Sequence, residues 1–86
     1  MGTYSVDASV VIWAIRHCMD RNDYVAWDGV RLARAYTPQL DRGYLKVLQS
    51  DVDHWLHTHE GAEPILHDEW EDILSTINTT LLAKAS

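Results

Sequence analysis

The feature that most restricts the fold of this chain is a run of apolar residues at spacings of three and four between positions 42 and 58. An α-helix turns 100° per residue, so this spacing places the apolar side chains on one face of a helix. Asp41 precedes the run and can accept a hydrogen bond from an unpaired backbone N–H of the first turn. The sequence therefore predicts a helix over 42–58 with one buried face, made of Leu45, Leu48, Val52, Trp55 and Leu56.

Three other segments have the same helical spacing, with turn-forming residues between them. The first follows Ser5 or Asp7, either of which can cap it, and runs to about position 20. The second, over about 24–36, ends before a proline, which cannot continue a helix. The last begins at His67 or Asp68 and ends at position 83, after a loop that we expect to be exposed. No segment alternates as a strand does, so the sequence predicts one all-α domain over residues 1–86, a compact bundle of about four helices.

Each of these helices also has a face that we expect to be buried. In the first helix the face consists of Ala8, Val11, Ile12, Ile15, Cys18 and Met19. In the second it consists of Trp27, Val30, Leu32 and Ala33. In the last it consists of Trp70, Ile73, Leu74, Ile77 and Leu81. Gly29 lies inside the second helix, where it costs about 1 kcal/mol relative to alanine.

The first helix has a second apolar strip, turned away from its core face and made of Val6, Val10, Trp13 and His17. Two interpretations of this strip stay open. A neighbouring helix of the same bundle covers it, because a helix that is apolar nearly all round is usually covered on two sides. Alternatively, it is a contact with a second copy or another protein, and Trp13 is its anchor, since large amphipathic side chains dominate the binding energy of interfaces.

Acidic residues outnumber basic ones and concentrate in the second half of the chain. The 13 Asp and Glu against 7 Lys and Arg give a net charge of −6, which argues against direct binding to nucleic acid or to an anionic membrane. No Lys or Arg lies between Lys46 and Lys84. The acids in that interval are Asp51, Asp53, Glu60, Glu63, Asp68, Glu69, Glu71 and Asp72.

This acidic stretch is either a solubilising face or a surface for a basic partner. Asp68 and Asp72 lie one helical turn apart, on the side of the last helix opposite its buried face. Near the start of that helix, acids also complement the helix dipole. If the stretch binds a partner, the contacting acids are expected to be Asp51, Asp53, Asp68, Glu69, Glu71 and Asp72.

The chain lacks the patterns of common catalytic sites. It has no G-x-S-x-G motif and no glycine-rich loop for phosphate. Its single cysteine, Cys18, cannot form an intrachain disulfide and has apolar neighbours, as a small buried hydrophobe would. The first residues have no basic signal region, and the longest apolar run, 10–15, is too short to span a bilayer. We therefore expect a cytoplasmic protein without enzymatic activity and without a cofactor.

Four histidines, His54, His57, His59 and His67, lie within fourteen positions of one another. His54 and His57 are three residues apart, a spacing that lets two imidazoles reach one ion if a third ligand comes from the following loop. No H-E-x-x-H or C-x-x-C pattern accompanies them. We therefore expect these histidines to be solvated and to hold no metal.

Three segments resemble a known group of proteins: the run from Ala14 to Tyr24, the Ser-Asp-Val-Asp-x-Trp-Leu segment at 50–56, and Asp-Glu-Trp at 68–70. They look like segments of small helical proteins of phages and mobile elements, some of which are similar to anti-CRISPR proteins. The likeness covers about residues 11–74, and its motifs are structural. It implies a stoichiometric inhibitor that docks on a host CRISPR effector, in particular on a subunit of a type I surveillance complex.

The sequence thus leads to one hypothesis and one alternative. The hypothesis is a small acidic inhibitor that occupies a basic, nucleic-acid-binding surface of an effector complex in the host cytoplasm. Its acids would take the place of phosphates on the partner's lysines and arginines. The alternative is a phage accessory, regulatory or antitoxin-like binding module. In either case the protein is a monomer or a homodimer.

Overall fold

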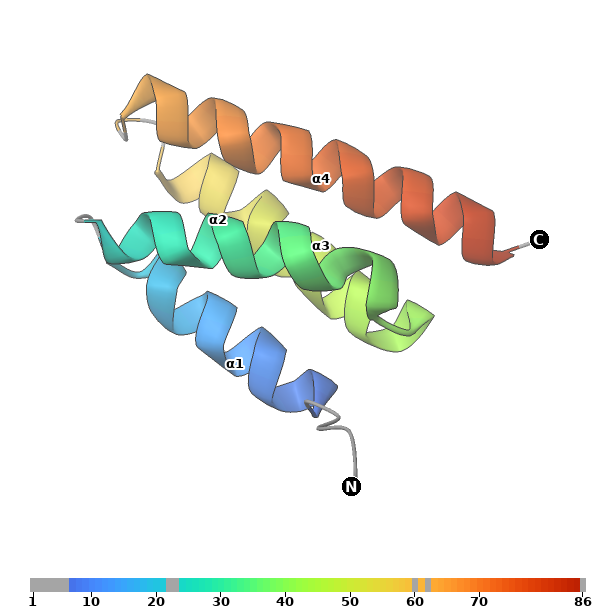
Figure 1. Ribbon diagram of the computed structural model, residues 1–86. Helices are drawn as coiled ribbons and strands as arrows, with labels where there is room; N and C mark the ends of the chain where they lie inside the picture. The colour runs from blue at the N-terminus through green and yellow to red at the C-terminus, as the bar shows by residue number, and fades with distance from the viewer. Residues whose placement is uncertain (1–6, 22–23, 60, 62, 86) are drawn as a thin grey trace.

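The computed structural model describes residues 7–21, 24–59, 61 and 63–85, which form four α-helices and a 3-10 turn (Figure 1). The predicted all-α bundle is therefore confirmed, and the described residues contain no strand. The elements are α1 (Ala8–Met19), α2 (Val25–Tyr36), η1 (Thr37–Gln39), α3 (Arg42–Thr58) and α4 (Pro64–Ala85).

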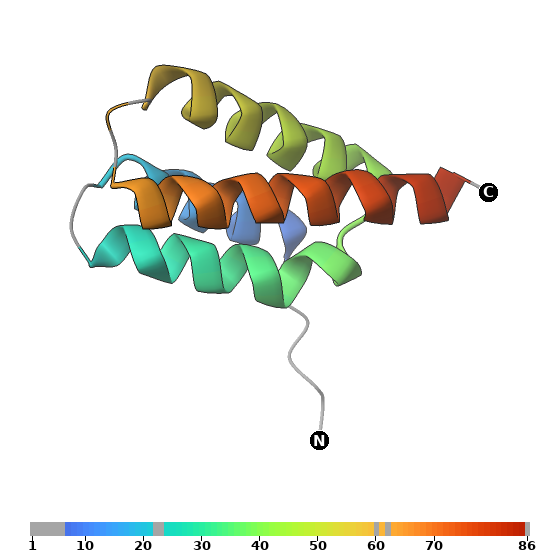
Figure 2. The same ribbon diagram turned by 90° about the horizontal axis from the view of Figure 1, so that it is seen from above.

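The helices form two antiparallel hairpins, α1 with α2 and α3 with α4 (Figure 1). Across the hairpins, α1 packs on α3 and α2 packs on α4. The two views agree that α1 and α4 lie on opposite sides of the molecule, with α2 and α3 between them (Figures 1 and 2). The outer faces of α1 and α4 therefore point in opposite directions.

All four helices contribute to one continuous core. Its completely buried side chains include Ile15 of α1, Ala33 of α2, Leu48 of α3 and Trp70 of α4. The centre of each predicted buried face is confirmed. The prediction was too broad at the margins, because the residues at the edge of each face are only half-buried: Ala8, Cys18, Trp27, Leu32, Leu56, Leu74 and Leu81.

Gly29 of α2 lies where this helix comes very close to α1. A Cβ atom at this position would lie 2.7 Å from Cβ of Cys18 and 3.4 Å from a ring carbon of Trp70. The glycine that costs helix propensity therefore permits an approach that a larger residue would block.

Two aspartates stand at the predicted starts of helices, and only one of them caps with its side chain. The Asp7 Oδ1 accepts hydrogen bonds from the Ser9 backbone N–H at 2.9 Å and from the Ser9 hydroxyl at 2.8 Å. Asp41 occupies the N-cap position of α3, but its side chain forms no capping hydrogen bond. Its backbone carbonyl accepts the Leu45 N–H at 2.8 Å.

The predicted start of the last helix was wrong by three to four residues, because α4 begins at Pro64. Proline suits the first helical position, where its missing N–H would have no partner in the helix. One turn later, the His67 N–H donates to the Glu63 carbonyl at 3.0 Å. The first turn contains no acid. The acids from Asp68 onward lie beyond it, so the support from the helix dipole predicted for them is wrong.

Candidate protein-binding face

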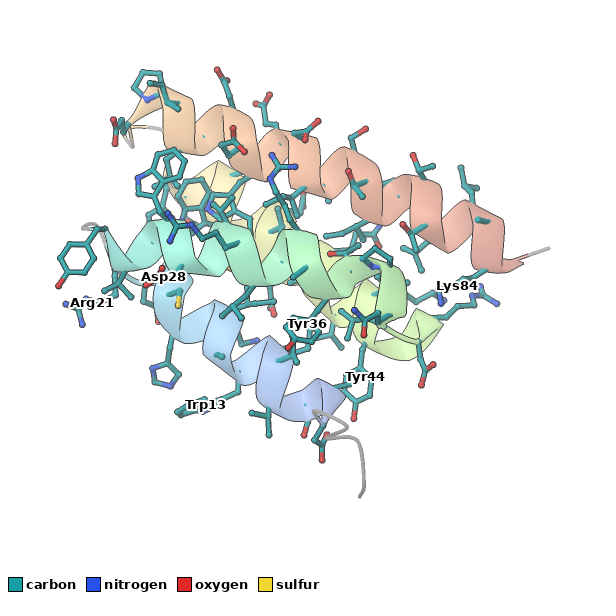
Figure 3. The ribbon with its side chains drawn as sticks, in the orientation of Figure 1. Trp13, Arg21, Asp28, Tyr36, Tyr44 and Lys84 are labelled. Carbon is teal, nitrogen blue, oxygen red and sulfur yellow. The ribbon has the colours of Figure 1, made fainter. Side chains whose placement is uncertain are left out.

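The outer face of α1 carries an apolar strip that the rest of the described chain leaves open. Val10 is 54% exposed and Trp13 is 61% exposed. The imidazole of His17 lies beside the Trp13 indole, with the ring centroids 4.0 Å apart. Figure 3 shows Trp13 pointing away from the bundle. The first interpretation, that a neighbouring helix covers the strip, is wrong for these three residues, because α2 and α3 both pack on the other side of α1. Val6 lies outside the described residues.

Next to this strip, an ion pair joins α1 to α3. The Arg16 Nε lies 2.6 Å from the Asp51 Oδ2. The hydrogen bond to Asp51, together with the charge of that carboxylate, raises the pKa of Arg16. The Asp51 side chain is only 23% exposed, whereas that of Arg16 is 52% exposed. The pair links the two helices at the edge of a groove.

The groove lies between the C-terminal halves of α1 and α3 and has a volume of about 400 Å³. Most of its lining area is apolar, but polar side chains outnumber apolar ones in it and include Asp20, Asp51, His54, Thr58 and His59. Among the described residues, Arg16 is the one Lys or Arg in this lining. These residues therefore present two carboxylates and one guanidinium, together with uncharged polar groups and two imidazoles.

Trp55 lies in the groove lining and is held rigidly. It is 4% exposed, and its indole N–H donates to the Met19 carbonyl at 3.0 Å. That bond satisfies one of the carbonyls that the end of α1 leaves without a helical partner. The His59 ring stacks on the Trp55 indole with centroids 4.9 Å apart and an interplanar angle of 9°. Because Trp55 is almost completely buried and His59 stacks on it, Trp55 closes one wall of the groove and exposes little of its ring.

The predicted acidic contact residues of α4 lie on the opposite side of the molecule from Trp13. Arg34 of α2 donates to Glu69 and, at 2.9 Å, to Asp72. The hydrogen bond to Glu69 and that to Asp72 raise the pKa of Arg34. Glu71 lies 3.3 Å from the His67 Nδ1. Much of the acidic surface on α4 is therefore already neutralised or contacted within the chain.

Asp68 and Asp53 complete the set of predicted contact residues. Asp68 is exposed and forms no ion pair with the described residues. Asp53 is exposed on α3, with its Oδ1 3.7 Å from the Nδ1 of His57. The structure thus brings Val10, Trp13, His17 and Asp51 to one side of the molecule, and it does not bring the α4 acids to them.

Within the part of the chain that the structure describes, His54 and His57 do not meet a third ligand as their spacing would permit. Among the described residues, the group of potential metal ligands whose atoms lie within 4.8 Å of one another is His67, Asp68 and Glu71. His54, His57 and His59 do not belong to it. Cys18 is half-buried, and desolvation, with a smaller contribution from the charge of Asp28, raises the pKa of its thiol. A raised pKa disfavours the thiolate, which is the reactive form of a cysteine.

Sequence reasoning missed the groove and both arginine bridges. Arg16 and Asp51 are 35 positions apart, as are Arg34 and Glu69. A local pattern carries no signal for such pairs, because they depend on how the hairpins pack. The exposed strip on α1, by contrast, could be predicted from the sequence, because its residues recur at helical spacing on a second face of the helix.

No protein-family model, curated protein or solved structure matches this chain. The resemblance to anti-CRISPR proteins therefore stays a prediction. Among the described helices, none is both long enough and apolar enough to cross a membrane.

Proposed function

We propose that this protein acts by binding another protein through the face that α1 and α3 form, and that it has no catalytic role. The observation that supports this proposal best is the exposure of Trp13. Trp55 and Trp70 are buried in the core, whereas Trp13 is 61% exposed in the middle of an apolar strip. Tryptophan is among the residues that most often dominate interface energies. Covering Trp13 with a partner would remove its large apolar surface from water.

The proposed partner is a protein with a basic surface. Beside Trp13, the groove offers the carboxylate of Asp20, whereas that of Asp51 already binds the guanidinium of Arg16. An arginine or lysine side chain of the partner would enter the groove and contact Asp20. The net charge of −6 would speed the approach of such a partner, and added salt would slow it.

In its finer form, the proposal is inhibition of a nucleic-acid-binding effector. Occupying a basic surface would keep nucleic acid away from it. On the resemblance described above, the effector would be a subunit of a type I CRISPR surveillance complex in the host cytoplasm. The alternative is a phage accessory, regulatory or antitoxin-like module, in which the same strip binds a different protein or a second copy.

The test is capture of a partner with tagged wild-type protein, Trp13→Ala and Tyr24→Ala. Tyr24 is a matched control, because it is also an exposed aromatic residue, at 79%, but it lies before α2. We expect Tyr24→Ala to bind as the wild type does, and Trp13→Ala to bind about 30-fold or more weakly, as removal of an interface anchor does. Equal affinities of the wild type and Trp13→Ala for the captured protein would contradict the proposal.

A second measurement tests the finer form separately. Purified type I surveillance complex is incubated with each variant, and its binding to target DNA is measured. We expect the wild type and Tyr24→Ala to block DNA binding and Trp13→Ala to fail. A complex that binds DNA normally with the wild type present would remove the anti-CRISPR form and leave the protein-binding proposal to the capture experiment.

A further inference from the structure

Six of the seven Lys and Arg residues of this acidic protein divide into two groups. Arg16, Arg31 and Arg34 each bind a carboxylate of the same chain. Arg42, Lys46 and Lys84 form no ion pair with the described residues, and all three belong to the start of α3 or the end of α4. Figure 3 shows Lys84 at this end of the bundle. A protein with an excess of acids thus gathers three cations without ion pairs to the described residues at one end, where Asp41 is an exposed acid next to Arg42.

The same end contains a groove of about 420 Å³ between α3 and α4. Arg42 and Lys46 line it from α3, and Leu81 and Leu82 line it from α4. Leu82 is 75% exposed. The Gln49 side-chain amide donates to the Asn78 Oδ1 at 2.6 Å and so ties the two helices together within the groove lining. Apolar side chains beside two cations fit a segment that has an exposed apolar residue next to carboxylates.

This chain carries such a segment at the start of α4, the opposite end of the same helix (Figure 2). Ile65 is 62% exposed, and Asp68, one helical turn further on, is exposed and free of ion pairs with the described residues. Glu63, just before the helix, is exposed as well. The two ends of the molecule are therefore complementary in charge, and each has an exposed aliphatic side chain.

We propose that the groove between α3 and α4 binds the start of α4 of a second copy, so that the molecules associate head to tail. Ile65 of one copy would pack on Leu82 of the next, and Glu63 and Asp68 would face Arg42 and Lys46. The two surfaces in contact differ, so each added copy leaves one free groove and one free α4 start. Such a contact repeats into open chains or, where the rotation between copies allows, closes into a symmetric assembly. It uses neither Trp13 nor the groove beside it.

The test is sedimentation of the purified protein over a range of concentrations up to about 1 mM, where weak contacts become populated. We expect the average mass to rise above that of the monomer as the concentration increases. Two double variants remove one end each: Lys46→Gln with Leu82→Ser removes the groove, and Ile65→Ser with Asp68→Asn removes the α4 start. All four positions are exposed, so both variants should fold. Each variant alone should associate at least about tenfold more weakly than the wild type.

Mixing the two variants gives the decisive result. One retains an intact groove and the other an intact α4 start, so an equimolar mixture should form one-to-one dimers and no larger species. Trp13→Ala should associate as the wild type does. The proposal is overturned if the wild type stays monomeric, if the mixture stays monomeric, or if Trp13→Ala abolishes association, which would place the contact between copies on α1.

Discussion

Helices α1 and α4 lie on opposite sides of the same core, and their outer faces differ. The inner faces are alike, with Ile15 and Ile73 at most 1% exposed. The outer face of α1 exposes the apolar strip with Val10 and Trp13, whereas the outer face of α4 exposes acids and hydroxyls, such as Asp68, and carries its exposed apolar side chains, Ile65 and Leu82, near its two ends. Water therefore solvates the middle of the α4 face well, but it solvates the apolar strip of α1 at a cost. This contrast supports the proposal that the α1 side contacts another protein.

The two helices are also tied to the bundle in a similar way. Arg16 links α1 to α3, and Arg34 links α4 to α2. Both arginines are more than one third exposed, so solvent screens these pairs, and each contributes about 0–1 kcal/mol. The difference between α1 and α4 therefore lies in the chemistry of their outer faces and not in how they are anchored.

The largest expected effects test whether the inner faces are equivalent. Ile15→Ala and Ile73→Ala should each lower the free energy of unfolding by about 2–5 kcal/mol, because each removes a buried side chain and leaves a cavity. Urea denaturation measures both, and Val10→Ala, at an exposed position of α1, serves as the control. A loss below about 1 kcal/mol for only one of the isoleucines would show that its helix is a loosely attached addition to the core.

Ile15 and Ile73 also illustrate which parts of the fold can be predicted from the sequence. The spacing of apolar residues is local information, so it located Ile15, Ile73 and the helices that carry them. The predicted start of α4 was wrong because we took Pro64 as part of the preceding loop. Proline is also favourable at the first helical position. The groove beside Trp55 depends on the packing of α1 against α3, and no local pattern encodes that packing.

A smaller effect is expected where α2 meets both outer helices. Gly29→Ala should lower the free energy of unfolding by about 1–3 kcal/mol, because the new methyl group would clash with Cys18 of α1 before it touches Trp70 of α4. Gly43→Ala is the matched control, since a Cβ there meets nothing within 4 Å and should stabilise α3 by up to about 1 kcal/mol. If Gly29→Ala is also stabilising, the close approach of α1 and α2 is incorrect.

The next prediction concerns the outer faces themselves. Trp13→Ala and the double variant Asp68→Lys with Glu71→Lys should each change stability by less than about 1 kcal/mol, because all three side chains are exposed. The double variant avoids Asp72, because this residue binds Arg34. Thermal and urea denaturation of both variants check this expectation. Unfolding of Trp13→Ala would show that the strip has a structural role.

Partner binding by the same two variants distinguishes the two candidate surfaces. The sequence alone favoured the acids of α4, whereas the structure places them opposite Trp13. With the partner on α1 and α3, the charge reversal on α4 should slow association through the loss of long-range attraction and leave the dissociation rate unchanged. Trp13→Ala should increase the dissociation rate. The reverse pattern, measured by surface plasmon resonance, would assign recognition to the acidic face of α4.

The smallest expected effect compares how the two helices begin. α1 starts at a carboxylate, and the hydrogen bonds from the Ser9 side chain and backbone hold the pKa of Asp7 below its ordinary value of 3.8. Because the pKa of Asp7 is lower in the folded state, the ionised cap stabilises the protein at pH values above the ordinary pKa. This contribution is lost as the pH falls through the pKa of the folded state.

α4 starts at Pro64, which does not titrate. The difference in unfolding free energy between the wild type and Asp7→Asn should therefore shrink, or change sign, on acidification, whereas the difference for Pro64→Ala should stay constant. Urea denaturation at a series of pH values measures both differences, and because the other carboxylates are common to all three proteins, their titration cancels. A difference for Asp7→Asn that does not vary with pH would mean that the capping bonds of α1 form equally well with an uncharged side chain.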